Sequence, residues 1–559
     1  MNSPKFTLMS AGLATLALSA CSNGDMSSSP AAQAQEPAPA GPVVSVAQGD
    51  VQGVSEDGIN VFRGIPYAAP PTGERRWTPP VEPEAWNGVR DASAFGPSCV
   101  QPPVPATSVY NDPPEQASED CLSLNVWAPA EAEDAPVIVW IHGGSLRIGG
   151  AAQPVYDGTA YAERDAVFVS INYRLGVLGW LAHPDLMAES EEGLSGNYGL
   201  MDQIAALEWV EENIAAFGGN PDNVTIMGES AGALSVTYLL TSPPAEGLFD
   251  KAIIQSTNTR NFAELGEASY DVPAAETEGA NLFEKLDFDT LEEARAAEAQ
   301  SLINRTTLAG YAPAGTVDGK YVPRQLNAAF DDGAFAHVPV LAGFNSGEAR
   351  TYRMLLPKKP DTAEAYEDAI RARYGDRADA FLDLYPADDM EESMLAVNRD
   401  NVFGWSTERV VRRAAQAGEP AYLYVFDHCY PAMAERDLCA FHASEVPFVF
   451  GTVGDLESYP ARWPKPPVEE AEALSSVLVD YWASFAATGE PESPDGSDWA
   501  PYSEDEAYLH IGDMPELRHD AYPGMFEFHE ALYQKRRDAG EGWFLGVGLA
   551  AEPLDEEER

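Results

Sequence analysis

Short apolar runs recur along the chain with the length and composition of buried strands. Six of them cover residues 137–141, 166–171, 224–227, 252–254, 338–342 and 422–426. Helical patterns lie between them, and in the segment 201–217 apolar side chains recur every three or four positions. Strands that alternate with helices predict an α/β fold whose mostly parallel sheet is covered on both faces. Because ligands of such sheets gather at the carboxyl ends of the strands, polar residues that follow these runs are the candidates for a functional site.

The pentad Gly228-Glu229-Ser230-Ala231-Gly232 lies between the strand-like run 224–227 and a helix-forming run at 233–240. The order strand, sharp turn, helix is the context in which a Gly-x-Ser-x-Gly pentad becomes a nucleophile elbow. The glycines let the strand and the helix approach closely, and the turn holds the serine clear of the backbone. The pattern therefore predicts that Ser230 is the nucleophile of a serine hydrolase that acts by acyl transfer.

A serine nucleophile needs a base, normally a histidine, and a carboxylate that orients it. Behind a nucleophile elbow these residues follow in the order Ser, acid, His. We expect His442 to be the base, because it follows the run 422–426 by one loop, and His428 is the main alternative. His337 precedes its strand and so lies at the wrong edge of the sheet. We expect the remaining candidates to lie at the surface of the polar C-terminal region: His510, His519 and His529.

Glu348 is the predicted carboxylate. It closes the segment Gly343-Phe344-Asn345-Ser346-Gly347-Glu348, directly after the run 338–342. Glycine and asparagine permit the turn that points the acid back toward the edge of the sheet. The alternative, Asp318 in Val317-Asp318-Gly319, is more typical of a turn that precedes a strand.

An oxyanion hole is predicted in the segment Trp140-Ile141-His142-Gly143-Gly144-Ser145, which continues directly out of the run 137–141. Its glycines leave backbone N–H groups bare toward a substrate. The N–H of Ala231, the first after the nucleophile, supplies the other side. We interpret His142 as structural, because it precedes Ser230 and adjoins the glycine turn.

Several further sequence blocks occur together with the pentad. The blocks are Phe62-Arg63-Gly64-Ile65-Pro66-Tyr67-Ala68, Ser118-Glu119-Asp120-Cys121-Leu122-Ser123-Leu124-Asn125-Val126-Trp127, Gly196-Asn197-Tyr198-Gly199-Leu200-Met201-Asp202-Gln203 and Gly218-Gly219-Asn220-Pro221. In these blocks and their order, the chain resembles the type-B carboxylesterase family, the cholinesterase-like branch of the α/β-hydrolases, from about residue 43 to 535. The resemblance implies an α/β-hydrolase fold with a large, mostly parallel sheet, helices on both faces and long loop insertions around the site. It also implies a serine ester hydrolase that forms an acyl-enzyme intermediate and needs no cofactor.

The family's site residues fall on positions of this chain. The resemblance implies the same three residues as the positional argument, with Ser230 as nucleophile, Glu348 as acid and His442 as base. It also implies three backbone donors to the oxyanion, contributed by Gly144, Ser145 and Ala231. Ser145 departs from the commonest pattern, which has a third glycine there, and its side chain is expected to narrow the pocket.

The cysteines fit an exported chain. Cys21 lies in an N-terminal segment that resembles a lipobox and is not expected to form a disulfide. The other four cysteines allow three pairings. We expect the two local ones, since an oxidising compartment favours disulfides. The first, Cys99–Cys121, is the loop that the family's second signature implies, and the second, Cys429–Cys439, would brace the loop before His442. No spacing of Cys and His indicates a metal site.

The Cys99–Cys121 loop lacks the tryptophan with which cholinesterases bind a quaternary ammonium group, and Tyr110 lies near that place. The family's other disulfide, downstream of the nucleophile, has no counterpart in this chain. Both departures argue against specificity for choline esters.

The N-terminus has the pattern of a targeting segment. Lys5 precedes an apolar stretch that is too short to span a bilayer, and Leu18-Ser19-Ala20-Cys21 resembles the lipobox of bacterial lipoproteins. We expect a signal peptide at 1–20, then a lipidated Cys21 with a disordered tether to residue 42. The hydrolase domain is predicted at 43–535 and an acidic tail at 536–559. The protein is thus expected to be exported and held by a lipid anchor in the periplasm or outer membrane of a bacterium.

The charge of the chain limits its partners. With 89 acidic and 34 basic residues, the net charge is −55, so no basic face is available for nucleic acid. The same field repels anionic substrates at low salt. We therefore expect a small neutral or cationic ester as substrate.

Two alternatives remain at this stage. One is a non-catalytic binding or adhesion protein on the same fold, like the neuroligin-like relatives, which typically lose a triad member. The other is a lipase or an amidase, which these motifs do not separate from an esterase.

Overall fold

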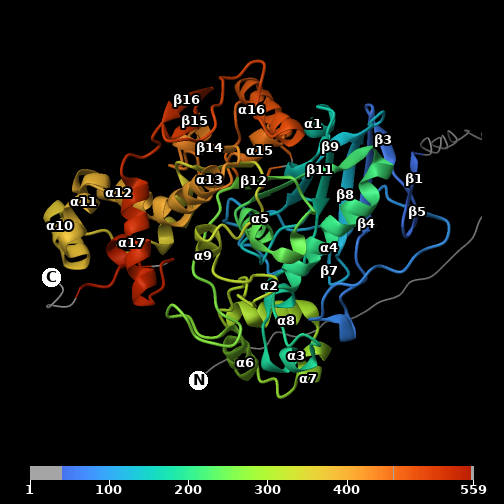
Figure 1. Cartoon of the computed structure of the whole chain (residues 1–559), viewed down its shortest axis with the longest axis horizontal. Coiled ribbons are helices and arrows are strands. Elements are labelled where there is room, and N and C mark those ends of the chain that lie inside the picture. The colour runs from blue at the N-terminus through green and yellow to red at the C-terminus, as the bar shows by residue number, and fades with distance from the viewer. Residues whose placement is uncertain (1–40, 458, 545, 555–559) are drawn as a thin grey trace, which may run out of the picture. The chain divides into compact units, whose positions relative to one another are not determined.

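The computed structural model describes residues 41–457, 459–544 and 546–554. The predicted signal peptide, Cys21 and the predicted tether up to residue 40 lie outside the described residues. Within them, eleven strands form one sheet in the order β16-β15-β14-β13-β12-β11-β9-β10-β8-β4-β3 (Figure 1). The strands are β1 (Val43–Val46), β2 (Gly49–Gln52), β3 (Val54–Glu56), β4 (Ile59–Pro66), β5 (Val89–Asp91), β6 (Ser98–Cys99), β7 (Ala117–Ser118), β8 (Ser123–Pro129), β9 (Ala135–Ile141), β10 (Val167–Ile171), β11 (Gly219–Glu229), β12 (Lys251–Gln255), β13 (Val340–Asn345), β14 (Ala421–Phe426), β15 (Ala507–Ile511) and β16 (Pro515–His519).

The six predicted strands are neighbours in this sheet. They correspond to β10, β9, β11, β12, β13 and β14, and each adjacent pair among them is parallel. The flanking strands β8, β4 and β3 on one side and β16 on the other pair antiparallel. The sheet is therefore mostly parallel, as predicted, with antiparallel edges that the apolar runs did not reveal.

Helices cover both faces of the sheet, because central strands such as β9 carry apolar side chains on both sides. In β9, Val137, Val139 and Ile141 pack in the same core as α4 and α5, whereas Ile138 and Trp140 pack on the opposite side with α16. The helices are α1 (Thr159–Ala162), α2 (Gly176–Trp180), α3 (Pro184–Glu189), α4 (Tyr198–Asn213), α5 (Ala231–Thr241), α6 (Ala275–Lys285), α7 (Leu291–Ala296), α8 (Ala299–Leu308), α9 (Leu326–Asp331), α10 (Ala363–Tyr374), α11 (Ala378–Leu384), α12 (Met390–Arg399), α13 (Trp405–Ala417), α14 (Pro431–Ala434), α15 (Val446–Val449), α16 (Val468–Thr488) and α17 (Met525–Ala539).

Short helical turns complete the fold. They are η1 (Gly73–Arg75), η2 (Pro154–Tyr156), η3 (Ile214–Phe217), η4 (Pro243–Ala245), η5 (Glu348–Leu355), η6 (Gly375–Arg377), η7 (Ala387–Asp389), the π-helical η8 (Asp400–Gly404) and η9 (Gly548–Ala550). The predicted helix 201–217 is thus α4 followed by the 3-10 turn η3. None of the helices in the described part of the chain has both the length and the apolarity needed to cross a bilayer.

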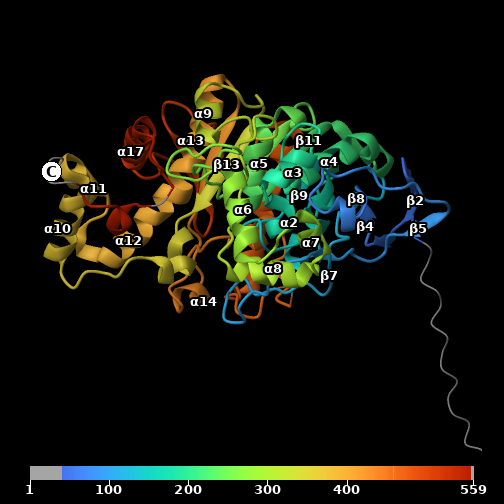
Figure 2. The same ribbon diagram turned by 90° about the horizontal axis from the view of Figure 1, so that it is seen from below.

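The C-terminal part of the domain extends further than predicted. The boundary expected between 535 and 536 falls inside α17, and the chain after this helix packs against the fold. Trp543 and Val547 are both buried, and the indole N–H of Trp543 donates to the carbonyl of Thr259. Figures 1 and 2 both place α17 beside α10, α11 and α12 at one end of the molecule. Apolar residues beyond 540 are therefore buried against the rest of the fold, which the sequence analysis had not predicted.

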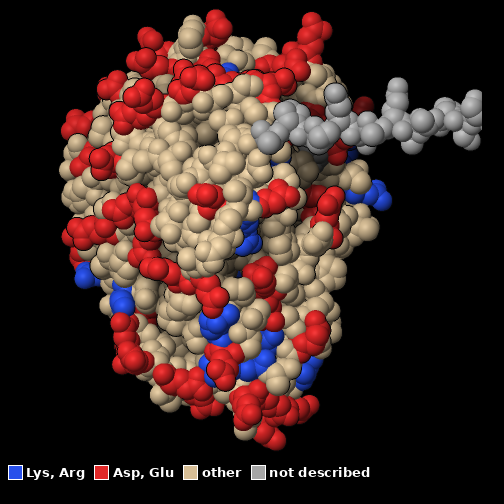
Figure 3. Space-filling view, turned by 90° about the vertical axis from the view of Figure 1, so that its right-hand side faces the viewer, with Lys and Arg blue, Asp and Glu red and all other residues tan. Residues whose placement is uncertain are grey.

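The surface carries the acidic excess. The face shown in Figure 3 bears many Asp and Glu side chains and few Lys and Arg ones. Inside, by contrast, several carboxylates are paired with guanidinium groups. Asp202 of α4 is fully buried and receives two bonds of 2.7 Å from the guanidinium of Arg174, which is itself 3% exposed. This pair fastens the loop after β10 to α4.

We expect Asp202→Ala to lower the free energy of unfolding by about 3–5 kcal/mol, because it leaves a buried guanidinium without its counter-charge. The midpoint of urea unfolding, followed by tryptophan fluorescence, measures the change. The matched control is Asp332→Ala, which removes an exposed ion pair with Arg324 and should leave the midpoint unchanged. Equal shifts in the two variants would contradict the prediction.

Candidate active site

Ser230 occupies a strained turn between β11 and α5. Its φ of 56° and ψ of −117° lie outside the regions that non-glycine residues usually adopt. The glycines on either side permit this turn: a Cβ on Gly228 would lie 2.4 Å from the carbonyl carbon of Gly232, and a Cβ on Gly232 would lie 2.0 Å from the Ile141 oxygen. Strand, helix and neighbouring strand therefore approach to distances that only glycine allows, with the geometry expected of a nucleophile elbow.

The structure brings Ser230, His442 and Glu348 into direct contact. The Nε2 atom of His442 lies 2.8 Å from Ser230 Oγ, and its Nδ1 atom lies 2.5 Å from Glu348 Oε2. Glu348 is fully buried and His442 is 4% exposed. A hydroxyl, an imidazole and a carboxylate aligned in this way can pass a proton from the hydroxyl to the ring while the carboxylate holds the ring in place.

Neighbouring groups fix the carboxylate. Its second oxygen, Oε1, accepts a bond of 2.6 Å from the Ser256 hydroxyl and one of 2.9 Å from the Asn345 N–H. Asn345 also donates its side-chain N–H to the carbonyl of Phe441, directly before His442. Ser256 follows β12 and Asn345 ends β13, so the sheet edge itself orients both the acid and the base loop.

The rival residues lie elsewhere. His428 is 3.6 Å from Asp513, and His142 stacks on Tyr173 with its Nδ1 atom 2.9 Å from the carbonyl of Gly143. Burial lowers the pKa of His142 to about 4, so this ring is neutral. Asp318 accepts three backbone N–H groups of its own turn, from residues 320 to 322.

The other histidines are split between surface and core. His337 and His519 are exposed, and His510 is partly buried beside Asp427. His529 was expected at the surface, and that expectation is wrong. It is 2% exposed, and its Nε2 atom lies 2.8 Å from the hydroxyl of Tyr385, because α17 packs against α11.

The predicted oxyanion segment borders the same cavity. Gly144 and Ser145 both have positive φ, 104° and 58°, and both line the cavity beside Ser230. Ala231 begins α5, so its N–H is among those that a helix leaves free at its first turn. These backbone positions border the place where an oxyanion would form.

Two further buried carboxylates surround the histidine, and sequence reasoning gave neither of them a role. Glu229 Oε1 lies 3.2 Å from His442 Nε2, and burial raises the pKa of Glu229 to about 8. Glu445 accepts hydrogen bonds from Gln255 and Asn345, and its pKa is also raised, by burial and then by the charge of Glu348. In the sequence, the signal for a role of these two residues was their position: Glu229 directly precedes Ser230, and Glu445 follows His442 by three residues.

The negative charges of these carboxylates and the burial of His442 shift the pKa of its ring in opposite directions. Burial alone lowers the pKa of an imidazole, but the carboxylates of Glu229 and Glu348 raise it more, to about 9 for His442. A carboxylate within contact of the ring stabilises the imidazolium, so the buried acids make His442 a stronger base.

The cavity in front of Ser230 has a volume of about 280 Å³. Aromatic side chains form much of its wall: Tyr110, Tyr156, Tyr352, Tyr459 and Trp463. The hydroxyl of Tyr110 donates to the carbonyl of His442 at 2.9 Å, so the residue near the missing tryptophan braces the base. Within the described residues no cluster of His, Cys, Asp and Glu has the arrangement of a metal site.

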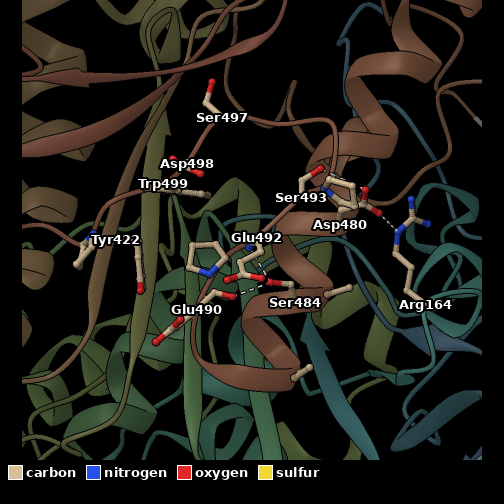
Figure 4. A pocket seen from close by; sticks show the side chains of 15 residues that line it. Arg164, Tyr422, Asp480, Ser484, Glu490, Glu492, Ser493, Ser497, Asp498 and Trp499 are labelled. Carbon is tan, nitrogen blue, oxygen red and sulfur yellow. Dashed lines mark hydrogen bonds and ion pairs between the residues drawn. The ribbon is translucent and has the colours of Figure 1, made fainter.

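A larger hollow of about 880 Å³ lies beside the C-terminal end of α16 (Figure 4). Its walls mix polar and apolar side chains, and Arg164 there is paired with Asp480. No histidine is among the described residues that line it, and its serines donate to backbone carbonyls or to Asp480. The contact between Ser230 and His442 therefore lies in the smaller cavity.

The structure joins Cys99 to Cys121 and Cys429 to Cys439, the two local pairings expected. The second disulfide closes the loop that leads to His442. Arg350 and Arg353 hold the same loop through Asp437.

Comparisons with known proteins agree with one another. Residues 40–529 match the carboxylesterase family. The chain is 38% identical over 467 residues to fumonisin B1 esterase of Sphingopyxis macrogoltabida, covering 81% of this chain and 83% of that one. It is 36% identical over 471 residues to para-nitrobenzyl esterase of Bacillus subtilis (strain 168), with 83% and 93% covered.

Solved structures of esterases are also similar to this chain. A PNB esterase structure has a TM-score of 0.74 at 31% identity, covering 87% of this chain and 99% of that one. The carboxylesterase EST55 of Geobacillus stearothermophilus also has a TM-score of 0.74, at 33% identity, with 89% and 100% covered.

We expect Glu229→Gln to lower the pKa of His442, because it removes a negative charge 3.2 Å from the ring nitrogen. NMR titration of the His442 ring measures the shift, which should run toward lower pH. Glu490→Gln, an exposed acid outside this cavity, is the control and should leave the titration where it is. An unchanged His442 titration in Glu229→Gln would show that the charge of Glu229 does not act on the base.

Proposed function

This chain belongs to the carboxylesterase family, and on that premise we propose that Ser230, His442 and Glu348 form its catalytic triad. The protein is an ester hydrolase with the α/β-hydrolase fold, as the family match and the relatives establish. The observation that supports the assignment of the triad is the continuous contact from Ser230 Oγ through the His442 ring to Glu348.

In the proposed acylation step, Ser230 Oγ attacks the ester carbonyl while His442 Nε2 accepts the hydroxyl proton. The carbonyl oxygen becomes an oxyanion, which the N–H groups of Gly144, Ser145 and Ala231 stabilise. His442 then gives its proton to the leaving alcohol, and an acyl-enzyme remains on Ser230. Glu348 stabilises the imidazolium through its bond to Nδ1.

In the deacylation step, His442 takes a proton from water, and the resulting hydroxide attacks the acyl group on the same face. Collapse of the second oxyanion breaks the bond to Ser230 Oγ, His442 gives its proton to that oxygen, and the acid is released with the Ser230 hydroxyl restored. This sequence uses only side chains and backbone N–H groups of the chain.

The substrate we propose is a small neutral or cationic ester. The cavity of about 280 Å³ limits the size of the group that can be held, and its aromatic walls suit an apolar body. Asp112 and Glu229 also line it, and no Lys or Arg is among the described lining residues. A negative charge on the substrate would therefore be repelled.

We also propose that the protein is exported and anchored by a lipid on Cys21. The two disulfides are compatible with an oxidising compartment. The lipobox-like Leu18-Ser19-Ala20-Cys21 is the support for the anchor. The expected location is the periplasm or the outer membrane.

Ser230→Ala should lower kcat by about 10⁶-fold, since the triad acts as a unit. Hydrolysis of p-nitrophenyl acetate measures the loss. The matched control is Ser235→Ala, a buried serine one turn further along α5 that does not line the cavity, which should keep its turnover. Normal turnover in Ser230→Ala would reject the triad and would favour a different nucleophile.

The full-length Cys21→Ser protein, expressed in bacteria, should no longer enter the detergent phase in a detergent phase-separation experiment, because no thiol remains at this position to be lipidated. Ser22→Ala is the matched control and should still partition there. If the Cys21→Ser protein also enters the detergent phase, lipidation at this residue is wrong. Turnover in the two variants should be the same.

A further inference from the structure

A second cavity lies beside α6, formed by the loop after β12, the segment 309–316 and the chain beyond α17. Its volume is about 600 Å³, and it shares no lining residue with the cavity in front of Ser230. Its walls include the apolar side chains of Trp180, Leu181, Phe262, Leu282 and Phe544. A cavity of this size with an apolar lining can hold a small organic molecule.

Arg260 contributes a positively charged guanidinium group to the lining of this cavity. Its guanidinium carbon lies 5.4 Å from the ring centroids of both Phe262 and Phe544, so the charged group is held between two aromatic side chains. One hydrogen bond is recorded among the described residues, a long one of 3.5 Å from Nη2 to the carbonyl of Pro313. The remaining N–H donors of Arg260 have no acceptor in the described part of the protein.

The lack of a counter-charge sets Arg260 apart. The chain has 89 acidic residues, and its buried guanidinium groups, such as those of Arg174, Arg399 and Arg409, are paired with carboxylates, whereas Arg260 is only partly buried. No carboxylate among the described residues lies within ion-pair distance of Arg260. Burial lowers its pKa, and among its neighbours the only opposing influence is Tyr238. A guanidinium remains protonated near neutral pH even so.

Arg260 is partly exposed, lines this cavity and has no carboxylate partner among the described residues, so its guanidinium is available to pair with an anion that enters the cavity. The planar fork of a guanidinium matches the two oxygens of a carboxylate. The apolar walls beside the fork match a hydrocarbon chain or ring. We propose that this cavity binds a small monocarboxylate with an apolar body, whose carboxylate pairs with Arg260.

The other charged groups at this cavity set a limit on the ligand. Lys285 adds a second positive charge, whereas Asp271 and Glu278 are exposed acids on its lining. A ligand with a single carboxylate can pair with Arg260 and keep the rest of its surface apolar. A ligand with several negative charges would meet Asp271 and Glu278.

The site is distinct from the ester cavity, but the chain connects the two. Ser256, which donates to Glu348, and Arg260 lie on the same loop after β12. The acid released by ester hydrolysis has the proposed ligand chemistry, so this cavity is placed to hold such acids without occupying the catalytic centre.

Isothermal titration calorimetry with sodium octanoate tests the proposal on the full folded domain in 0.15 M NaCl. We expect one binding event that is weakened at least tenfold in Arg260→Gln. Octanamide, which lacks the charge, should bind the unchanged protein at least tenfold more weakly than octanoate. Arg324→Gln, a surface arginine paired with Asp332, is the matched control and should bind octanoate as the unchanged protein does.

A second variant separates loss of the site from loss of the fold. Ala314→Phe places a ring in the cavity while keeping Arg260, and it should also abolish the binding event. Circular dichroism verifies that both variants are folded, and turnover of p-nitrophenyl acetate should be unchanged in both. Equal octanoate affinity in Arg260→Gln and the unchanged protein, or equal affinity for octanoate and octanamide, would overturn the proposal. So would the absence of any octanoate binding event outside the catalytic centre. A failed triad assignment would be seen instead in the turnover of Ser230→Ala.

Discussion

The parallel register of β11, β12, β13 and β14 is the constraint on which the site depends. Glu229 of β11 is level with Gln255 of β12, Gln255 is level with Gly343 of β13, and Gly343 is level with Tyr424 of β14. The segments that leave these strands therefore start at the same edge of the sheet. Ser230, Ser256, Glu348 and His442 come from four different segments and still meet within hydrogen-bond distance.

The interior of the site is unusual for its density of carboxylates. Glu229, Glu348 and Glu445 are all buried around one imidazole, and each would be costly there without a partner. Glu348 is satisfied by Ser256, Asn345 and His442, and Glu445 by Gln255 and Asn345. Among the described residues, the imidazole of His442 is the charged partner of Glu229. Burial raises the pKa of Glu229, and its carboxylate stabilises the positive ring. The electrostatic state of His442 is a property of this group of acids as a whole.

Arg260 presents the opposite case. In a chain with a large excess of acids, a guanidinium held between two phenyl rings has no carboxylate partner in the described structure. The ester cavity is lined by Asp112 and Glu229 and, among the described residues, by no Lys or Arg, whereas the cavity beside α6 is lined by Arg260, which has no carboxylate partner there. The two cavities are thus complementary to different molecules, the first to a neutral or cationic ester and the second to an anionic acid.

The sequence by itself determined the six central strands and the nucleophile elbow. Short, continuous apolar runs with helical patterns between them favour strands buried on both faces. Gly228 and Gly232 leave a local signature because any side chain there would collide with the backbone. Chain order was enough to select Glu348 and His442, since the acid and the base follow strands at a common edge. Antiparallel strands such as β4 and β8 carried no comparable pattern.

Tertiary packing decided the rest. The burial of His529 and the continuation of the domain past residue 535 depend on α17 packing against α11, a contact between segments more than a hundred residues apart. The roles of Glu229 and Glu445 depend on their distance from His442, and the free charge of Arg260 depends on which acids fail to reach it. Such features arise from contacts that are remote in the chain, and a linear sequence specifies residue types but not which of them become neighbours.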